Sequence, residues 1–212
     1  IFIHRSEQLK MLGCHVIYTV PISLIYSERG PDAMDIYDGD IQVLPMVMVR
    51  NQGSEVCEEG LAAMRQLVHE RVFHGAGVDA ARTLVGDIFD QPETLDQLCL
   101  MSGGHMRNLM LMAQEAIKQT DTLPIGKKQV RLAITKARNT YRNAVYDAQW
   151  PILARVHQTK EILNDEAHRE LLFNRCILEY RYIDDEGEIV CWRDIHPLLR
   201  GVKEFKAALE RL

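Results

Sequence analysis

A glycine-containing turn near the middle of the chain places an arginine where it could bind phosphate. The run Ser102-Gly103-Gly104-His105-Met106-Arg107 comes directly before a segment with helical spacing, so we expect Arg107 in the first turn of a helix. A guanidinium group is always charged and can donate to two phosphate oxygens at once. The sequence therefore predicts a phosphate contact at Arg107. The alternative is a tight turn between two helices with a solvated arginine.

A second group of cations stands on one predicted helix. Residues 127–142 hold six basic side chains and no acidic one. At helical periodicity four of the six form a single stripe, made of Lys127, Arg131, Arg138 and Arg142. The stripe would suit the phosphate backbone of a nucleic acid, but we favour a solvated outer face. The later helix that would read bases, about 165–174, is rich in acidic residues, so base reading in a major groove is not expected.

The elements that must position these residues follow one another in three groups. Two apolar, β-branched runs, 14–21 and 41–49, are typical of buried strands in a parallel sheet. Helical periodicity then predicts helices at about 61–72, 79–89, 93–101 and 105–118. Three more helices are predicted near the carboxyl end, at about 127–146, 151–163 and 165–174. Two alternating runs around the turn Asp184-Asp-Glu-Gly187 predict a hairpin with strands 177–183 and 188–192.

This order predicts a mostly α chain with a small α/β remnant. Residues 1–53 are expected to hold the last parallel strands of an incomplete α/β sheet, and residues 54–122 a helical bundle. Residues 123–212 are expected to form a winged-helix domain, since three helices followed by a hairpin is the winged-helix order. The chain starts at Ile1 without a methionine, and we expect the earlier strands of the sheet to precede it.

The order of elements resembles the carboxyl-terminal half of AAA+ ATPases and their STAND relatives. The resemblance implies that residues 1–53 are the end of a P-loop sheet and that residues 54–122 are a helical lid. The resemblance implies that Arg107 is the "sensor 2" arginine of a lid helix, which contacts the terminal phosphates of the nucleotide. It implies that Thr19, before Pro21 at the end of the first apolar run, holds the "sensor 1" position, although the family more often has asparagine there. For His196, in the run Trp192 to Leu199, it implies a contact with the nucleotide's diphosphate. The alternative for His196 is a histidine packed beside a proline.

The chain departs from this family at the nucleotide site itself. It has no Gly-x-x-x-x-Gly-Lys-Ser/Thr motif, and no apolar strand pattern ends in an Asp-Glu pair. ATP and Mg²⁺ are therefore expected only in an intact protein that has a P-loop region, and this chain alone is not expected to hydrolyse ATP. The predicted function is the regulatory, sensing part of an ATP-dependent switch. The alternative is a winged-helix module that binds DNA or protein without nucleotide chemistry.

The amino-acid composition predicts the cellular compartment and the partners of the protein. Hydrophobic residues make up 47% and charged residues 26%, with a net charge of −5, which is the balance of a soluble globular protein. Five cysteines without a Cys-x-x-Cys pair indicate free thiols in the cytoplasm and neither disulfides nor a metal site. The expected partners are the P-loop region and either another protein or further copies of the chain. DNA is less favoured, and no membrane contact is expected.

Overall fold

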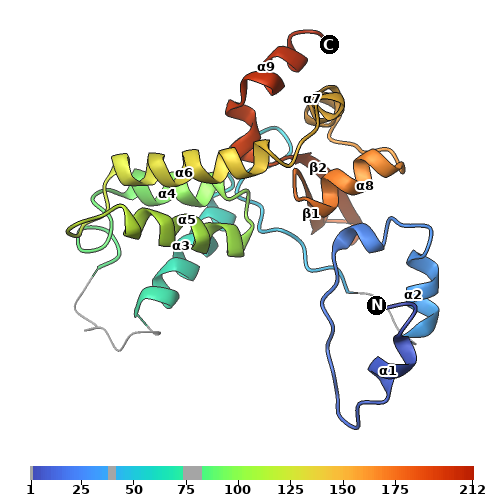
Figure 1. Cartoon of the computed structure of the whole chain (residues 1–212). Helices are drawn as coiled ribbons and strands as arrows, with labels where there is room; N and C mark the ends of the chain where they lie inside the picture. The colour runs from blue at the N-terminus through green and yellow to red at the C-terminus, as the bar shows by residue number, and fades with distance from the viewer. Residues whose placement is uncertain (1, 38–41, 74–82) are drawn as a thin grey trace.

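The computed structural model describes residues 2–37, 42–73 and 83–212. This part of the chain is mostly helical with one two-stranded sheet, which confirms the predicted fold class at that level (Figure 1). The α-helices are α1 (Ser6–Lys10), α2 (Gly30–Ile36), α3 (Glu58–Phe73), α4 (Pro92–Met101), α5 (Met106–Lys118), α6 (Lys127–Arg142), α7 (Trp150–Thr159), α8 (Glu166–Phe173) and α9 (Lys203–Leu209). The 3-10 helices and strands are η1 (Ile22–Leu24), η2 (Asp147–Gln149), η3 (Pro197–Gly201), β1 (Ile177–Ile183) and β2 (Ile189–Ile195). In the described ranges, no helix is both long and apolar enough to cross a membrane.

Helices α3 to α6 pack together as a bundle around the largest hydrophobic cluster (Figure 1). Helix α6 buries Val130, Ala133 and Ile134 in this cluster, and their spacing of three and one follows the apolar face of a helix. The predicted helices 61–72, 93–101 and 105–118 are confirmed by α3, α4 and α5. The helix predicted at 79–89 is wrong for residues 83–89, which form turns and isolated bridges, and its first residues lie outside the described ranges.

A second hydrophobic cluster lies in what we call the carboxyl-terminal unit, which comprises α7, α8, the hairpin and α9. Its largest buried side chains include Leu153, Leu171 and Ile177. The predicted hairpin is confirmed, with Tyr180 paired to Trp192 in an antiparallel register. The predicted domain boundaries remain predictions, although α6 lies beyond residue 123 and packs in the first cluster rather than the second.

The two apolar runs predicted as parallel strands do not form strands in this structure. Residues 14–21 and 42–49 are irregular, and residue 41 lies outside the described ranges. Ile17 is 95% exposed and Leu44 is 81% exposed. A parallel strand needs neighbouring strands for its hydrogen bonds, and the only described sheet is the hairpin of β1 and β2. Both predicted strands are therefore wrong for this chain, and the expected burial is wrong except at the end of the second run, where Val49 is 1% exposed.

Glycines let the turn between α4 and α5 pack closely against two other segments. Gly103 and Gly104 have φ angles of +62° and +78°, a region that strongly favours glycine. A Cβ atom on Gly104 would lie 1.7 Å from the carbonyl oxygen of Val47. A Cβ atom on Gly103 would lie 2.4 Å from Cδ1 of Leu178 in β1. The predicted sharp turn is confirmed, and it joins the bundle to residue 47 and to the hairpin.

Replacing Gly104 by alanine should destabilise the fold more than the backbone angle alone requires. Gly187, in the hairpin turn, also has a positive φ, +85°, but a Cβ atom added to it would meet nothing within 4 Å. Gly187→Ala should therefore cost about 1 kcal/mol from backbone strain. Gly104→Ala should cost at least about 3 kcal/mol, because the clash with Val47 is added to the same strain. Urea unfolding of both variants measures the difference, and equal losses would contradict the packing.

Candidate functional site

A groove of about 400 Å³ runs between α5 and α6, and we call it the α5–α6 groove. Apolar side chains line it, including Leu111, Met112, Ala133, Ala137 and Ala144. Four of its lining residues are cationic, namely Arg107, Lys118, Lys136 and Arg175. The single carboxylate in the lining belongs to Glu115, whose Oε1 lies 2.8 Å from Nζ of Lys136. The groove therefore combines an apolar surface with a surplus of positive charge.

Two arginines approach the groove from different elements. Arg107 is exposed in the first turn of α5, which begins after His105 as the N-cap. Arg175 is exposed just after α8, where its φ of +58° turns the chain into β1. Burial lowers the pKa of His105, and the charges of Arg175 and Arg107 lower it further. The imidazole beside these two guanidinium groups is therefore held neutral, and the positive potential of the groove comes from the arginines.

His196 lies at the junction between the bundle and the carboxyl-terminal unit. Its side chain is 0% exposed, and its ring centroid lies 4.3 Å from that of Tyr141 in α6. The backbone N–H of Leu198 donates to its Nδ1 at 3.2 Å, and the side-chain amide of Asn108 lies 3.0 Å from its Nε2. A neutral ring that accepts at Nδ1 carries its proton on Nε2, so the Asn108 amide accepts this proton only with its oxygen, rather than its Nδ2, turned toward the ring. Burial lowers the pKa of His196 to about 3, with a smaller contribution from His105, so the ring is uncharged at neutral pH.

The structure brings two of the three predicted nucleotide-sensing residues close together and leaves the third apart. Arg107 is adjacent in sequence to Asn108, whose side chain contacts His196. The full burial of His196 removes its ring from direct contact with a ligand in this conformation. Thr19 lies exposed on the irregular segment 14–21, and its side chain has no hydrogen bond within the described ranges. Neither of the first two residues is linked to Thr19 by a contact in that part of the chain.

The predicted basic stripe on α6 divides into two pairs. Nε of Arg138 donates to the carbonyl oxygen of Leu198 at 3.2 Å, and Nε of Arg142 donates to Glu204 at 2.9 Å. These two arginines therefore connect α6 to η3 and α9. Lys127 and Arg131 are exposed at the other end of α6, where a hollow of about 430 Å³ is lined by five residues, Lys127, Lys128, Arg131, Leu132 and Thr135. Within the described ranges, Lys127 and Arg131 are thus the members of the stripe whose side chains make no hydrogen bond or ion pair with another element.

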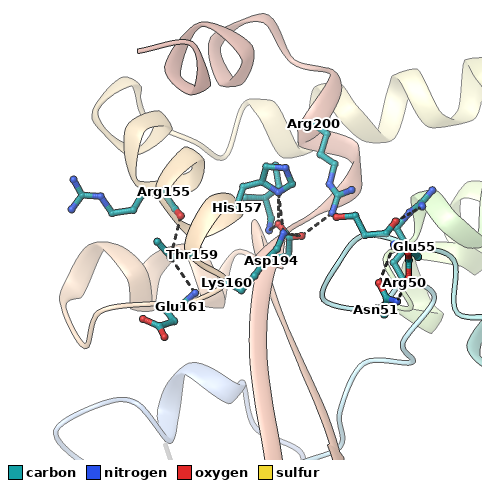
Figure 2. A network of polar contacts seen from close by, with 12 residues as sticks. Arg50, Asn51, Glu55, Arg155, His157, Thr159, Lys160, Glu161, Asp194 and Arg200 are labelled. Carbon is teal, nitrogen blue, oxygen red and sulfur yellow. Dashed lines mark hydrogen bonds and ion pairs between the residues drawn. The ribbon is translucent and has the colours of Figure 1, made fainter. Parts of the chain in front are cut away.

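Asp194 forms a buried polar cluster that the sequence did not point to (Figure 2). The carboxylate is 4% exposed and accepts from His157 at 2.7 Å, Lys160 at 2.5 Å and Arg200 at 2.8 Å. Burial raises the pKa of Asp194, but the hydrogen bonds from His157 and Lys160 and the charge of Arg200 outweigh it and lower the pKa overall. One sequence signal could have revealed this cluster. Asp194 stands two residues after Trp192 in a predicted strand, so its carboxylate lies on the same, buried face of that strand.

The chemistry available at Asp194 is limited by what surrounds His157. A histidine oriented by a carboxylate can act as a general base toward a nearby nucleophile. Within the described ranges, however, the hydrogen bonds of the His157 side chain go to Asp194 and Lys160 and to no serine, threonine or cysteine. Three cationic or imidazole groups on one carboxylate hold α7, β2 and η3 together. We therefore assign the Asp194 cluster a structural role.

A second buried carboxylate connects the opposite face of the hairpin to the amino-terminal segment. Glu179 accepts from Arg181 at 2.7 Å and from Arg193 at 2.9 Å, and it also contacts the hydroxyl of Tyr26. Burial raises the pKa of Glu179, yet these partners lower it overall. The guanidinium of Arg193 also lies 5.5 Å from the centroid of the Tyr26 ring. The segment around η1 is therefore held against the sheet by charge.

Comparison of the chain with models of protein families, with curated proteins and with solved structures found no match. Within the described ranges, no group of three His, Cys, Asp or Glu side chains is arranged to hold a metal ion. The α5–α6 groove is the site with an accessible cavity and convergent charge, so it is the candidate site.

The buried imidazole predicts a specific dependence of stability on pH. The folded protein keeps His196 neutral down to a pH of about 3, whereas an ordinary histidine takes up its proton near 6.5. The contribution of neutral His196 to the free energy of unfolding is therefore complete above pH 6.5. It is lost as the pH falls toward 3, at up to about 1.4 kcal/mol per pH unit, because the unfolded chain takes up the proton first. Urea unfolding at a series of pH values in this range should show that the free energy of unfolding falls less steeply with decreasing pH in His196→Gln than in the wild type. The exposed His15 gives the control: His15→Gln should keep the wild-type slope, and an unchanged slope in His196→Gln would refute this account.

Proposed function

We propose that the chain is the sensing part of an ATP-dependent switch and that its α5–α6 groove binds the terminal phosphates of a nucleotide. The observation that supports this proposal is the charge of the groove, which has four cations and one carboxylate that is already paired with Lys136. Arg107 and Arg175 make no ion pair within the described ranges, so their guanidinium groups are available to phosphate oxygens. Phosphate recognition by paired arginines is favoured because each guanidinium donates to two oxygens.

In this proposal, the groove of this chain contacts the phosphates of ATP, whereas Mg²⁺ is bound by another part of the intact protein. The groove fits a polyphosphate, but it offers Mg²⁺ no carboxylate beyond Glu115, which Lys136 neutralises. The metal and the phosphate-cradling loop therefore belong to a P-loop region of the intact protein. The apolar run 14–21, which exposes Ile17, would extend the sheet of that region. Helices α6 to α8 with the hairpin would be the winged helix, and the five free thiols suit a cytoplasmic location.

A path from the groove to the carboxyl-terminal unit gives the switch a physical basis. Arg107 and Asn108 are neighbours in the first turn of α5, and Asn108 contacts the buried ring of His196. A phosphate that draws Arg107 into the groove would also move Asn108, because one helical turn moves as a unit. The joint at His196 would then favour one of two orientations of the carboxyl-terminal unit. A ligand shifts such an equilibrium only through different contacts in the two states, and Arg107 would supply that difference.

Titration calorimetry with tripolyphosphate at low ionic strength tests the phosphate site. Wild-type protein should bind, and Arg107→Ala should weaken binding by about tenfold or more, since a charged hydrogen bond is worth about 1.5–3 kcal/mol. Lys128→Ala is the matched control, because it removes one exposed cation outside the groove and should leave the affinity almost unchanged. Absence of binding, or an equal loss in both variants, would overturn the proposal.

The second candidate function is contact with a nucleic-acid backbone through the free end of the α6 stripe. The observation that favours it is the hollow that Lys127, Lys128 and Arg131 line, in which no acidic residue takes part. Such contacts neutralise phosphates without reading bases, and their affinity falls steeply with salt. In the calorimetric test, a loss of anion binding in Lys128→Ala with retention in Arg107→Ala would favour this candidate over the α5–α6 groove.

A further inference from the structure

The hairpin ends in a surface that its own chain does not cover. We call residues 182–189 the acidic hairpin tip. Four of the five residues from 184 to 188 are acidic, namely Asp184, Asp185, Glu186 and Glu188. Large apolar side chains beside them are exposed, with 40% for Tyr182, 72% for Ile183 and 69% for Ile189. Apolar groups next to a concentration of like charge mark a contact surface rather than a solvated turn.

The geometry of the turn leaves three of these carboxylates for a partner. The carboxylate of Asp184 accepts from the backbone N–H groups of Glu186 and Glu188 at 3.0 and 2.8 Å. This fixes the shape of the turn, so that little conformational entropy is lost when the tip binds. The side chains of Asp185, Glu186 and Glu188 make no hydrogen bond or ion pair within the described ranges.

The α5–α6 groove has the complementary properties. Its surplus of cations faces solvent, with Arg107, Lys136 and Arg175 exposed. Its apolar lining includes Leu111, which is 53% exposed. A cavity of about 400 Å³ is within the size range of specific binding sites. Opposite charge around matching apolar surfaces favours one docked arrangement over others.

We propose that the acidic hairpin tip of one copy docks in the α5–α6 groove of a second copy. The carboxylates of Asp185, Glu186 and Glu188 pair with the cations of the groove, and Ile183 and Ile189 cover its apolar lining. Because the two surfaces differ, the contact joins copies head to tail or occurs twice across a two-fold axis. The contact area is small, which gives an association in the micromolar range or weaker.

This contact gives the proposed phosphate site a regulator. Phosphate and the hairpin tip use the same guanidinium group of Arg107, so binding of one excludes the other. Phosphate would thus separate the copies, and high concentration of the chain would weaken phosphate binding by the same factor. The competition rests on the proposed function, whereas the contact between copies does not.

Sedimentation velocity at low salt, over a concentration series from about 5 to 500 µM, tests the contact. The wild-type chain should associate as its concentration rises. Arg107→Glu and Asp185→Lys should each weaken association by about tenfold or more, because each places like charges together. A mixture of these two variants should associate again, since an intact tip of the first meets an intact groove of the second.

Two controls keep the result specific to the two surfaces. Lys128→Glu makes the same charge change as Arg107→Glu at the hollow on α6 and should leave association unchanged. Ile189→Ser removes apolar surface from the tip without changing charge and should weaken association. Monomeric wild type at all concentrations, or association that survives both charge reversals, would overturn the contact. Association without any binding of tripolyphosphate would retain the contact and refute the proposed function instead.

Discussion

The buried ring of His196 makes its contacts where the two hydrophobic clusters meet. The ring lies against Tyr141 of α6 in a tilted arrangement, lies beside Asn108 of α5, and accepts from the backbone of Leu198. The 3-10 helix η3, which follows His196, extends the joint, because its Leu198 packs in the first cluster and its Leu199 in the second. An uncharged imidazole can satisfy these partners in a dry environment, whereas a charged ring would carry a large desolvation cost. Protonation of this one side chain would therefore weaken the junction between the two clusters, which Arg138 and Arg142 of α6 also bridge.

Charge is buried on both faces of the hairpin and fixes what packs there. Asp194 connects α7 and η3 to β2, and Glu179 holds the segment around Tyr26 against the opposite face. A buried carboxylate is tolerated because each has several cationic or hydrogen-bonding partners. The hairpin therefore acts as a rigid centre for the carboxyl-terminal unit. Its tip, the remaining part of the hairpin, has no such partners within the described ranges and stays exposed, which is why it is available for a contact with another copy.

Local sequence pattern predicted what depends on local structure and failed where distant partners decide. Helical periodicity located α3 to α8, and strand alternation located the hairpin, because each pattern is set by one element's own buried face. The apolar runs 14–21 and 42–49 have the composition of buried strands, but composition does not provide neighbouring strands to pair with. Arg107 could be proposed from its position after a glycine turn. Arg175 and Asn108 could not, since only the packing of α8 and α5 brings them to the groove and to His196.

In the proposed switch, occupancy of the groove at Arg107 is transmitted to the joint at His196. Hydrogen–deuterium exchange of the Leu198 amide, whose N–H donates to the His196 ring, measures that joint directly, because exchange requires the hydrogen bond to open. Saturating tripolyphosphate should change the exchange of this amide in the wild-type chain and leave it unchanged in Arg107→Ala. Tripolyphosphate that binds without altering exchange at Leu198 would contradict the account, because the groove would then be a binding site with no connection to the carboxyl-terminal unit.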